Sequence, residues 1–137
     1  MYRTLVASAA LLLAACSAGP RVEVEVPRGE LAAALRFNLH SSDTALAPAP
    51  VEMIEVLDGG RPASGPERGT ACWILVHKPG TPPLQLPTAV LYGTVPPGYV
   101  ASGTATPLTL GPYVVRVRAG GVWTQTRFSV TAANTIE

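Results

Sequence analysis

Two histidines and two cysteines are the side chains of this chain best suited to catalysis or metal binding. Neither His40 nor His77 has a second His, Cys, Asp or Glu at the spacing of a metal site. A Ser-Ser-Asp sequence follows His40, but catalytic triads converge from separate elements, and serine and aspartate are ordinary loop residues. His77 precedes a Lys-Pro pair and is typical of a solvated strand end. We therefore expect no catalytic residue, no metal site and no cofactor.

Cys72 lies in the apolar run Ala-Cys-Trp-Ile-Leu-Val at residues 71–76. Apolar surroundings raise the pKa of a thiol and leave it unreactive, so we expect Cys72 to be a small core residue rather than a nucleophile. The alternative is a disulfide between Cys16 and Cys72, which requires that Cys16 carry no other modification.

The clearest local structure is a hairpin at the end of the chain. Odd positions from 113 to 119 and even positions from 122 to 130 carry the inward-facing set, and Gly120-Gly121 suits a two-residue turn. This register pairs Ala119 with Val122, Val117 with Thr124, Val115 with Thr126, and Tyr113 with Phe128. It also places Trp123 opposite Arg118 on the polar face. Either the arginine covers the indole in a cation–π pair, or both residues contact a partner.

The start of the chain has the pattern of an export signal. An apolar run from residue 5 to residue 15 follows Arg3, and it is too short to span a bilayer as a helix. It ends in Leu13-Ala14-Ala15-Cys16, which resembles the lipobox of bacterial lipoproteins. The resemblance implies that residues 1–15 are a lipoprotein signal peptide, and that Cys16 becomes the acylated first residue of the mature chain.

The same resemblance implies a location and a first partner. Bacterial lipoproteins with Asp after the lipidated cysteine tend to stay in the inner membrane, whereas this chain has Ser17, which implies sorting to the outer membrane. The bilayer, reached through acylated Cys16, is then the expected anchor on the periplasmic side. Residues 16–20 form the lipidated cysteine and its tether, and four extended residues reach at most roughly 14 Å.

Composition bounds the rest of the chain. Loss of residues 1–15 would leave nine basic and nine acidic residues, because the signal removes Arg3 and no acid. A neutral domain lacks the positive charge that nucleic-acid binding requires, so we expect no nucleic-acid partner. Residues 21–137 suit one domain with its own core.

Alternating and short apolar segments favour an all-β fold of seven to eight strands, with almost no helix. We expect an antiparallel immunoglobulin-like β-sandwich with a helical turn within residues 29–34 and loops at 41–50 and 61–69. The expected strands cover residues 21–26, 35–39, 51–57, 71–76, 88–94, 99–102 and the two arms of the hairpin.

Residues 108–115 (Leu-Thr-Leu-Gly-Pro-Tyr-Val-Val) resemble the start of the penultimate strand in fibronectin type III and related immunoglobulin-like domains. There, an apolar residue, a Gly/Pro turn and a tyrosine form the tyrosine corner. Trp73 would match the core tryptophan of such domains, and the resemblance covers about residues 71–131, with extra strands before it. Small proteobacterial envelope lipoproteins of unknown role share this appearance, including the segment Tyr-Gly-Thr-Val-Pro-Pro-Gly-Tyr at residues 92–99.

We therefore expect a non-catalytic, lipid-anchored protein of the cell envelope that contacts another envelope protein. One alternative is a periplasmic module that binds a small ligand, which a deep apolar pocket with convergent polar groups would favour. Another is an accessory lipoprotein of a secretion system, although the chain has no diagnostic motif for one. An enzyme acting through His40 ranks third.

Overall fold

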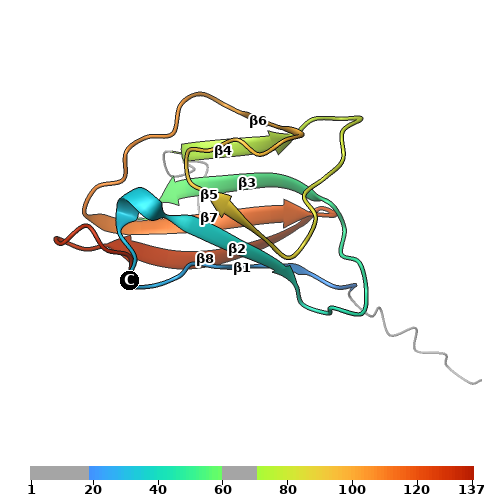
Figure 1. Ribbon diagram of the computed structural model, residues 1–137, viewed down its shortest axis with the longest axis horizontal. Coiled ribbons are helices and arrows are strands. Elements are labelled where there is room, and N and C mark those ends of the chain that lie inside the picture. The colour runs from blue at the N-terminus through green and yellow to red at the C-terminus, as the bar shows by residue number, and fades with distance from the viewer. Residues whose placement is uncertain (1–18, 60–70) are drawn as a thin grey trace, which may run out of the picture.

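A computed structural model describes residues 19–59 and 71–137. These residues form eight strands and a single 3-10 turn, arranged as two antiparallel sheets packed face to face (Figure 1). The elements are β1 (Val22–Glu25), η1 (Ala32–Ala34), β2 (Arg36–Ser41), β3 (Val51–Asp58), β4 (Ala71–His77), β5 (Thr88–Leu91), β6 (Tyr99–Ala101), β7 (Gly111–Ala119) and β8 (Val122–Val130). The all-β fold, the strand count and the helical turn are confirmed.

The strand order is that of an immunoglobulin-like sandwich. One sheet has the order β1-β2-β5 and the other has the order β6-β4-β3-β7-β8. In the letters used for immunoglobulin domains, the first sheet corresponds to A-B-E, and β4-β3-β7-β8 corresponds to C′-C-F-G. β6 is an additional edge strand beside β4. The likeness therefore begins at β1 and not at residue 71, because the strands before residue 71 are the A, B and C strands themselves.

The prediction that Trp73 matches the core tryptophan of immunoglobulin-like domains is wrong about its strand. Its side chain is buried in the core, but it lies on β4, the C′ strand. The core tryptophan of immunoglobulin domains lies on strand C, which is β3 here, and Val56 occupies the position that pairs with Trp73. The T-shaped contact of Trp73 with the Tyr92 ring, at 5.3 Å between centroids, fills this part of the core instead.

The tyrosine corner is present. Tyr113, near the start of β7, donates its hydroxyl proton to the Thr109 carbonyl oxygen at 2.9 Å and accepts from the Thr109 amide at 3.0 Å. Its ring is buried and stacks on Phe128 with 5.6 Å between centroids. The hydroxyl thus fixes the loop before β7 while the ring packs in the core, as the resemblance implied.

Period-two alternation explains which side chains enter the core. In β1 and β2 every second residue is buried, because one face of the small sheet packs on the large sheet and the other meets water. The fully buried side chains come from both sheets and the last residues of the chain: Phe37, Leu39, Val51, Ile54, Val56, Leu75, Val115, Val117, Val130 and Ile136.

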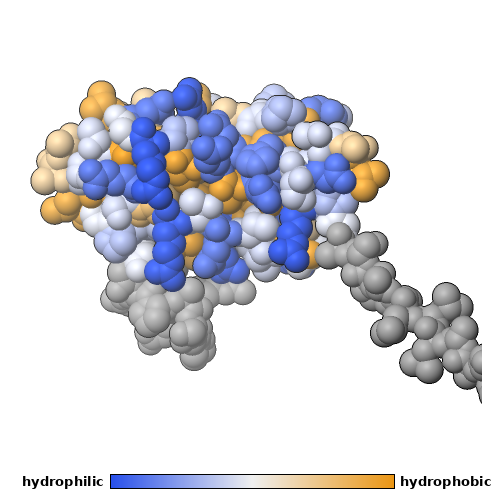
Figure 2. Space-filling view, turned by 90° about the horizontal axis from the view of Figure 1, so that it is seen from below, coloured by the Kyte–Doolittle hydropathy of each residue, from blue (hydrophilic) through white to orange (hydrophobic). Residues whose placement is uncertain are grey.

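The β1 and β8 edges of the two sheets are joined by side chains. Thr124 and Thr126 donate their hydroxyl protons to the carbonyl oxygens of Val22 and Val24, each at 2.7 Å. This explains why two threonines stand at inward positions of β8, where a hydroxyl needs a partner. Figure 2 shows the molecule from the side on which β1 and β8 lie in Figure 1. Polar side chains cover much of this surface, and apolar side chains are visible at both ends of the sandwich.

The strand predicted over residues 88–94 ends at Leu91, because Gly93 adopts a positive φ of 83° and the Thr94 amide donates back to the Leu91 carbonyl in a turn.

The predicted signal peptide, Cys16 and the loop at 61–69 lie outside the described residues. Within the described ranges, no helix has the length and apolar character that a membrane crossing requires.

Candidate functional site

The terminal hairpin has the predicted register. β7 and β8 pair Ala119 with Val122 and Tyr113 with Phe128 around the Gly120-Gly121 turn, whose φ angles are 57° and 75°. Positive φ at both turn residues is what a type I′ turn needs, and glycine adopts it without strain. Val122 is the one inward position that remains half exposed, because the turn extends past the end of the core.

Trp123 lies opposite Arg118 on the outer face of the large sheet, as predicted. The Arg118 guanidinium carbon is 5.9 Å from the centre of the indole ring. Arg116, the diagonal neighbour, is closer, with its guanidinium carbon 4.2 Å from that centre. Both distances are within the range of a cation–π contact. The indole is partly exposed and is flanked by two arginines rather than one.

Each of these arginines is paired with a glutamate of β3. Arg118 Nε lies 3.2 Å from Glu52 Oε2 without the alignment of a hydrogen bond, and Arg116 Nη1 lies 3.8 Å from Glu55 Oε2. Glu55 is only 5% exposed, and it is the one buried charged residue of the described chain. A buried carboxylate needs a nearby cation, which explains the position of Arg116. The arginines are therefore held between an acid and the indole.

We name this set, Glu52, Glu55, Arg116, Arg118 and Trp123, the Trp123 surface. Sequence reasoning found Trp123 and Arg118 from the hairpin register and missed Arg116. The same register indicates Arg116, because it makes Arg116 the diagonal neighbour of Trp123, and diagonal neighbours across a strand pair lie within reach of long side chains. The two glutamates could not be assigned, because the pairing of β3 with β7 is a long-range contact with a register shift between Val51 and Met53.

The histidines have structural partners. His40 Nε2 lies 2.9 Å from Glu23 Oε2, its cross-strand neighbour, and the pair is exposed. Ser41 and Asp43 form a local turn, with the Asp43 side chain accepting from the Ala45 amide at 2.9 Å. Residues 41–43 thus form the turn expected of them, and the His40 ring pairs with Glu23.

His77 contacts the loop that follows its strand. Its Nε2 lies 2.8 Å from the Thr81 carbonyl oxygen, and its ring lies 5.2 Å from the Tyr99 ring. Among residues 19–59 and 71–137, no three His, Cys, Asp or Glu side chains are grouped closely enough to hold a metal ion.

Cys72 is buried in the core cluster, as predicted. Burial, with a smaller effect from the negative charge of Asp58, raises the pKa of its thiol above the ordinary value. The thiolate is therefore disfavoured at neutral pH, and the position is unsuited to nucleophilic chemistry.

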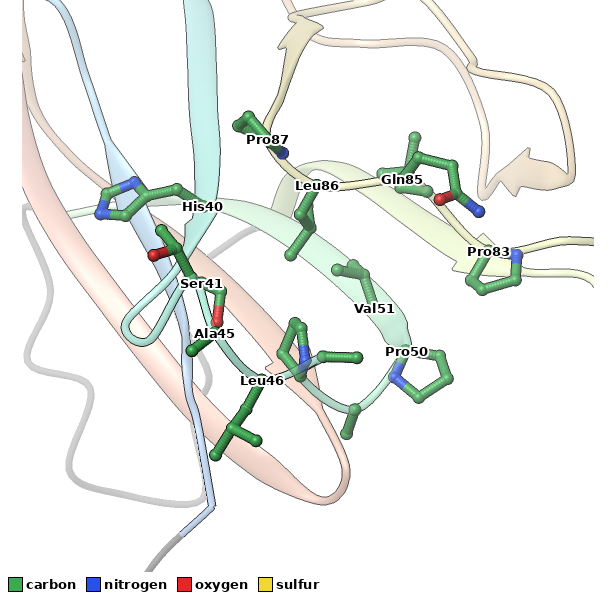
Figure 3. Close-up of a pocket in the computed structure, with 15 residues that line it drawn as sticks. His40, Ser41, Ala45, Leu46, Pro50, Val51, Pro83, Gln85, Leu86 and Pro87 are labelled. Atoms are coloured by element: carbon green, nitrogen blue, oxygen red, sulfur yellow. The ribbon is translucent and has the colours of Figure 1, made fainter.

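Sequence reasoning also missed a pocket of about 490 Å³ at one end of the sandwich. The loops at residues 44–50 and 83–87 form its walls, and Leu86 and Val51 extend into the space between them (Figure 3). Only four of its lining residues have polar side chains, namely His40, Ser41, Thr44 and Gln85. The Tyr99 hydroxyl donates to the Val51 carbonyl at 2.7 Å and accepts from the Leu84 amide at 3.2 Å, which ties two lining residues of the pocket to β6. No sequence pattern marks the pocket, because its loops are far apart in the chain.

Comparison with known proteins adds no identification: no family model, no curated protein and no solved structure matches this chain.

Proposed function

We propose that this chain is a non-catalytic, lipid-anchored protein of the bacterial cell envelope that contacts another envelope protein through the Trp123 surface. Residues 1–15 direct export, and acylated Cys16 holds the protein in the outer membrane on the periplasmic side. Residues 21–137 are the contact domain. The Leu13-Ala14-Ala15-Cys16 sequence supports the anchor, and the geometry around Trp123 supports the contact.

The observation that carries the contact is the position of a partly exposed indole between two arginines on the outer face of the large sheet. Trp and Arg are the residues most enriched among those that dominate binding energy in protein interfaces. The ion pairs to Glu52 and Glu55 hold both guanidinium groups in place before a partner arrives. Groups that are already ordered lose less conformational entropy on binding.

Two measurements test the proposal in intact cells. Cells supplied with a labelled fatty acid should give a labelled protein, and Cys16→Ser should abolish the label and release the protein from the membrane. Several acyl chains anchor a protein stably, whereas one chain does so only marginally. Wild-type protein that carries no label and is free in the periplasm would refute the anchor.

Cross-linking tests the contact separately. We expect Trp123→Ala to fold normally and to lose a specific cross-linked partner. The control is Leu110→Ala, which removes another exposed apolar side chain (68% exposed) at the opposite end of the sandwich and should keep that cross-link. If both variants keep the cross-link, Trp123 serves only to pack the hairpin, and the Trp123 surface is not the contact.

The pocket supports a second candidate function, a small-ligand module. Its volume lies within the range of ligand sites, and its walls are mainly Pro, Leu and Ala side chains, which would suit an apolar ligand. It has few convergent polar groups, so the contact function remains the better supported. A ligand that native mass spectrometry detects on the purified protein, and that Leu86→Asp removes without unfolding, would favour this second function.

A further inference from the structure

One end of the sandwich, which we name the tether end, consists of residues 19–21, 42–50, 78–87 and 120–122. The described part of the chain begins here at Gly19, and the C terminus lies at the opposite end (Figure 1). The Arg21 amide donates to Ser42 Oγ at 2.8 Å, and the Ser42 amide donates to the Arg21 carbonyl at 2.8 Å. The first described residues are therefore fixed against the loop at 42–50. Ala49 of this loop lines both the large pocket and a second cavity of about 280 Å³ beside Pro20 and Val122.

The tether end is almost without charge. Arg21, Asp43 and Lys78 are its only charged residues, so the formal charge is one positive unit. The remaining residues are mainly Pro, Gly, Ala, Leu and Thr. Leu46 is 57% exposed, and Val122 is 50% exposed. Such a surface loses little hydration when it leaves water, because it has few charges to desolvate.

The distance to the anchor distinguishes this end from the other. Exposed apolar side chains also occur at the opposite end, where Leu110 is 68% exposed and Leu31 is 60% exposed. However, Gly19 is three residues from Cys16, and three Cα–Cα steps span at most about 11 Å. An acylated Cys16 at the bilayer surface would therefore hold Gly19 within about 11 Å of that surface, and the tether end is the part of the domain that Gly19 belongs to.

We propose that the tether end is a lipid-docking surface, in which Leu46 and Val122 enter the headgroup region of the bilayer. This inference rests on the proposed acylation of Cys16. The occupant is a lipid bilayer because the end is nearly neutral and apolar, and because the anchor would place it there. Docking would restrict the domain to one orientation. The Trp123 surface, one residue beyond Val122 on β8, would then lie close to the membrane and meet a partner that is also near the membrane.

Depth-dependent quenching tests the docking on the full acylated chain. An environment-sensitive fluorophore is attached to a cysteine introduced as Leu46→Cys, in a Cys72→Ala background, and the protein is reconstituted into vesicles of phosphatidylethanolamine and phosphatidylglycerol. Leu110→Cys in the same background is the control at the opposite end. We expect spin-labelled lipids to quench the probe at position 46 at least twofold more than the probe at position 110, with a blue-shifted emission at position 46.

The outcomes separate docking from anchoring. If the protein carries the fatty-acid label and floats with the vesicles, but the two probes are quenched equally, docking is refuted and the anchor stands. A blue-shifted probe at position 46 that lipid spin labels do not quench would mean that protein covers this end, which also refutes docking. Absence of the fatty-acid label refutes the anchor and the docking together. Leu46→Asp, with the probe moved to Val122→Cys, should reduce quenching while flotation persists.

Discussion

The tyrosine corner provides the sharpest test of how this fold is held together. Tyr113 has two separable contributions, because its ring stacks on Phe128 in the core while its hydroxyl binds both the amide and the carbonyl of Thr109. Tyr113→Phe removes the hydroxyl and keeps the ring. Tyr113→Ala removes both, so the two variants divide the residue into a hydrogen-bonding part and a packing part.

The structure sets the expected magnitudes. A hydrogen bond within a protein contributes about 0.5–1.5 kcal/mol net. Thr109 is exposed, so water can replace the lost partners, and we expect Tyr113→Phe to lower the free energy of unfolding by about 1–2 kcal/mol. The ring is 8% exposed, and loss of a buried aromatic side chain costs about 3–5 kcal/mol. Tyr113→Ala should therefore be the more damaging by at least about 2 kcal/mol.

Urea unfolding measures both losses, provided that the slope with denaturant stays constant across the variants. Trp123→Ala serves as the surface control and should cost less than about 1 kcal/mol, the value of an exposed aromatic–cation contact. Equal losses for Tyr113→Phe and Tyr113→Ala would refute the division between ring and hydroxyl. A loss for Trp123→Ala as large as that for Tyr113→Ala would mean that the indole is a core residue and that the inferred outer face is wrong.

Three further predictions follow from the packing. Thiol reagents should modify Cys72 only after denaturation, and Cys72→Ala should cost about 1 kcal/mol in urea unfolding, since few atoms leave the core; rapid labelling of the native protein would contradict its burial. Thr126→Val should lower the free energy of unfolding by about 1 kcal/mol and speed hydrogen exchange in β1, because the Val24 carbonyl loses its donor; unchanged exchange would show that the β1–β8 contact is unimportant. Burial raises the pKa of Tyr92 to about 12 from the model-peptide value of 10.0. The neutral phenol is thus favoured in the folded state. The contribution of Tyr92 to the free energy of unfolding is therefore fully present below pH 10 and is lost as the pH rises towards 12. Tyr92→Phe should flatten the decline in unfolding free energy over that interval, and a decline of unchanged steepness would refute this assignment.

Much of the strand structure could be predicted from local sequence, for a physical reason. Side chains of a strand alternate between faces, so the Val-Glu repeat of β1 and the alternation of Leu35, Phe37 and Leu39 each indicate a half-buried strand. The hairpin was predicted pair by pair, because a two-residue turn fixes the register of the strands on either side of it. The lipobox-like sequence at Cys16 is likewise local, and its acylation remains a prediction.

Long-range pairing could not be predicted in this way. Which strand lies beside β3, and with what shift, depends on how the two sheets close around a common core, and the sequence has no local mark for it. That pairing brings Glu55 to Arg116 and moves Trp73 one strand away from the expected position. The same closure brings the loops at 44–50 and 83–87 together around one pocket.

The sequence alone determined which segments are strands and which faces of them are apolar, because these follow from alternation along one segment. The ion pairs of the Trp123 surface with β3 and the pocket depended on the tertiary structure, because each combines residues that are distant in the chain and become neighbours only when the sheet is assembled.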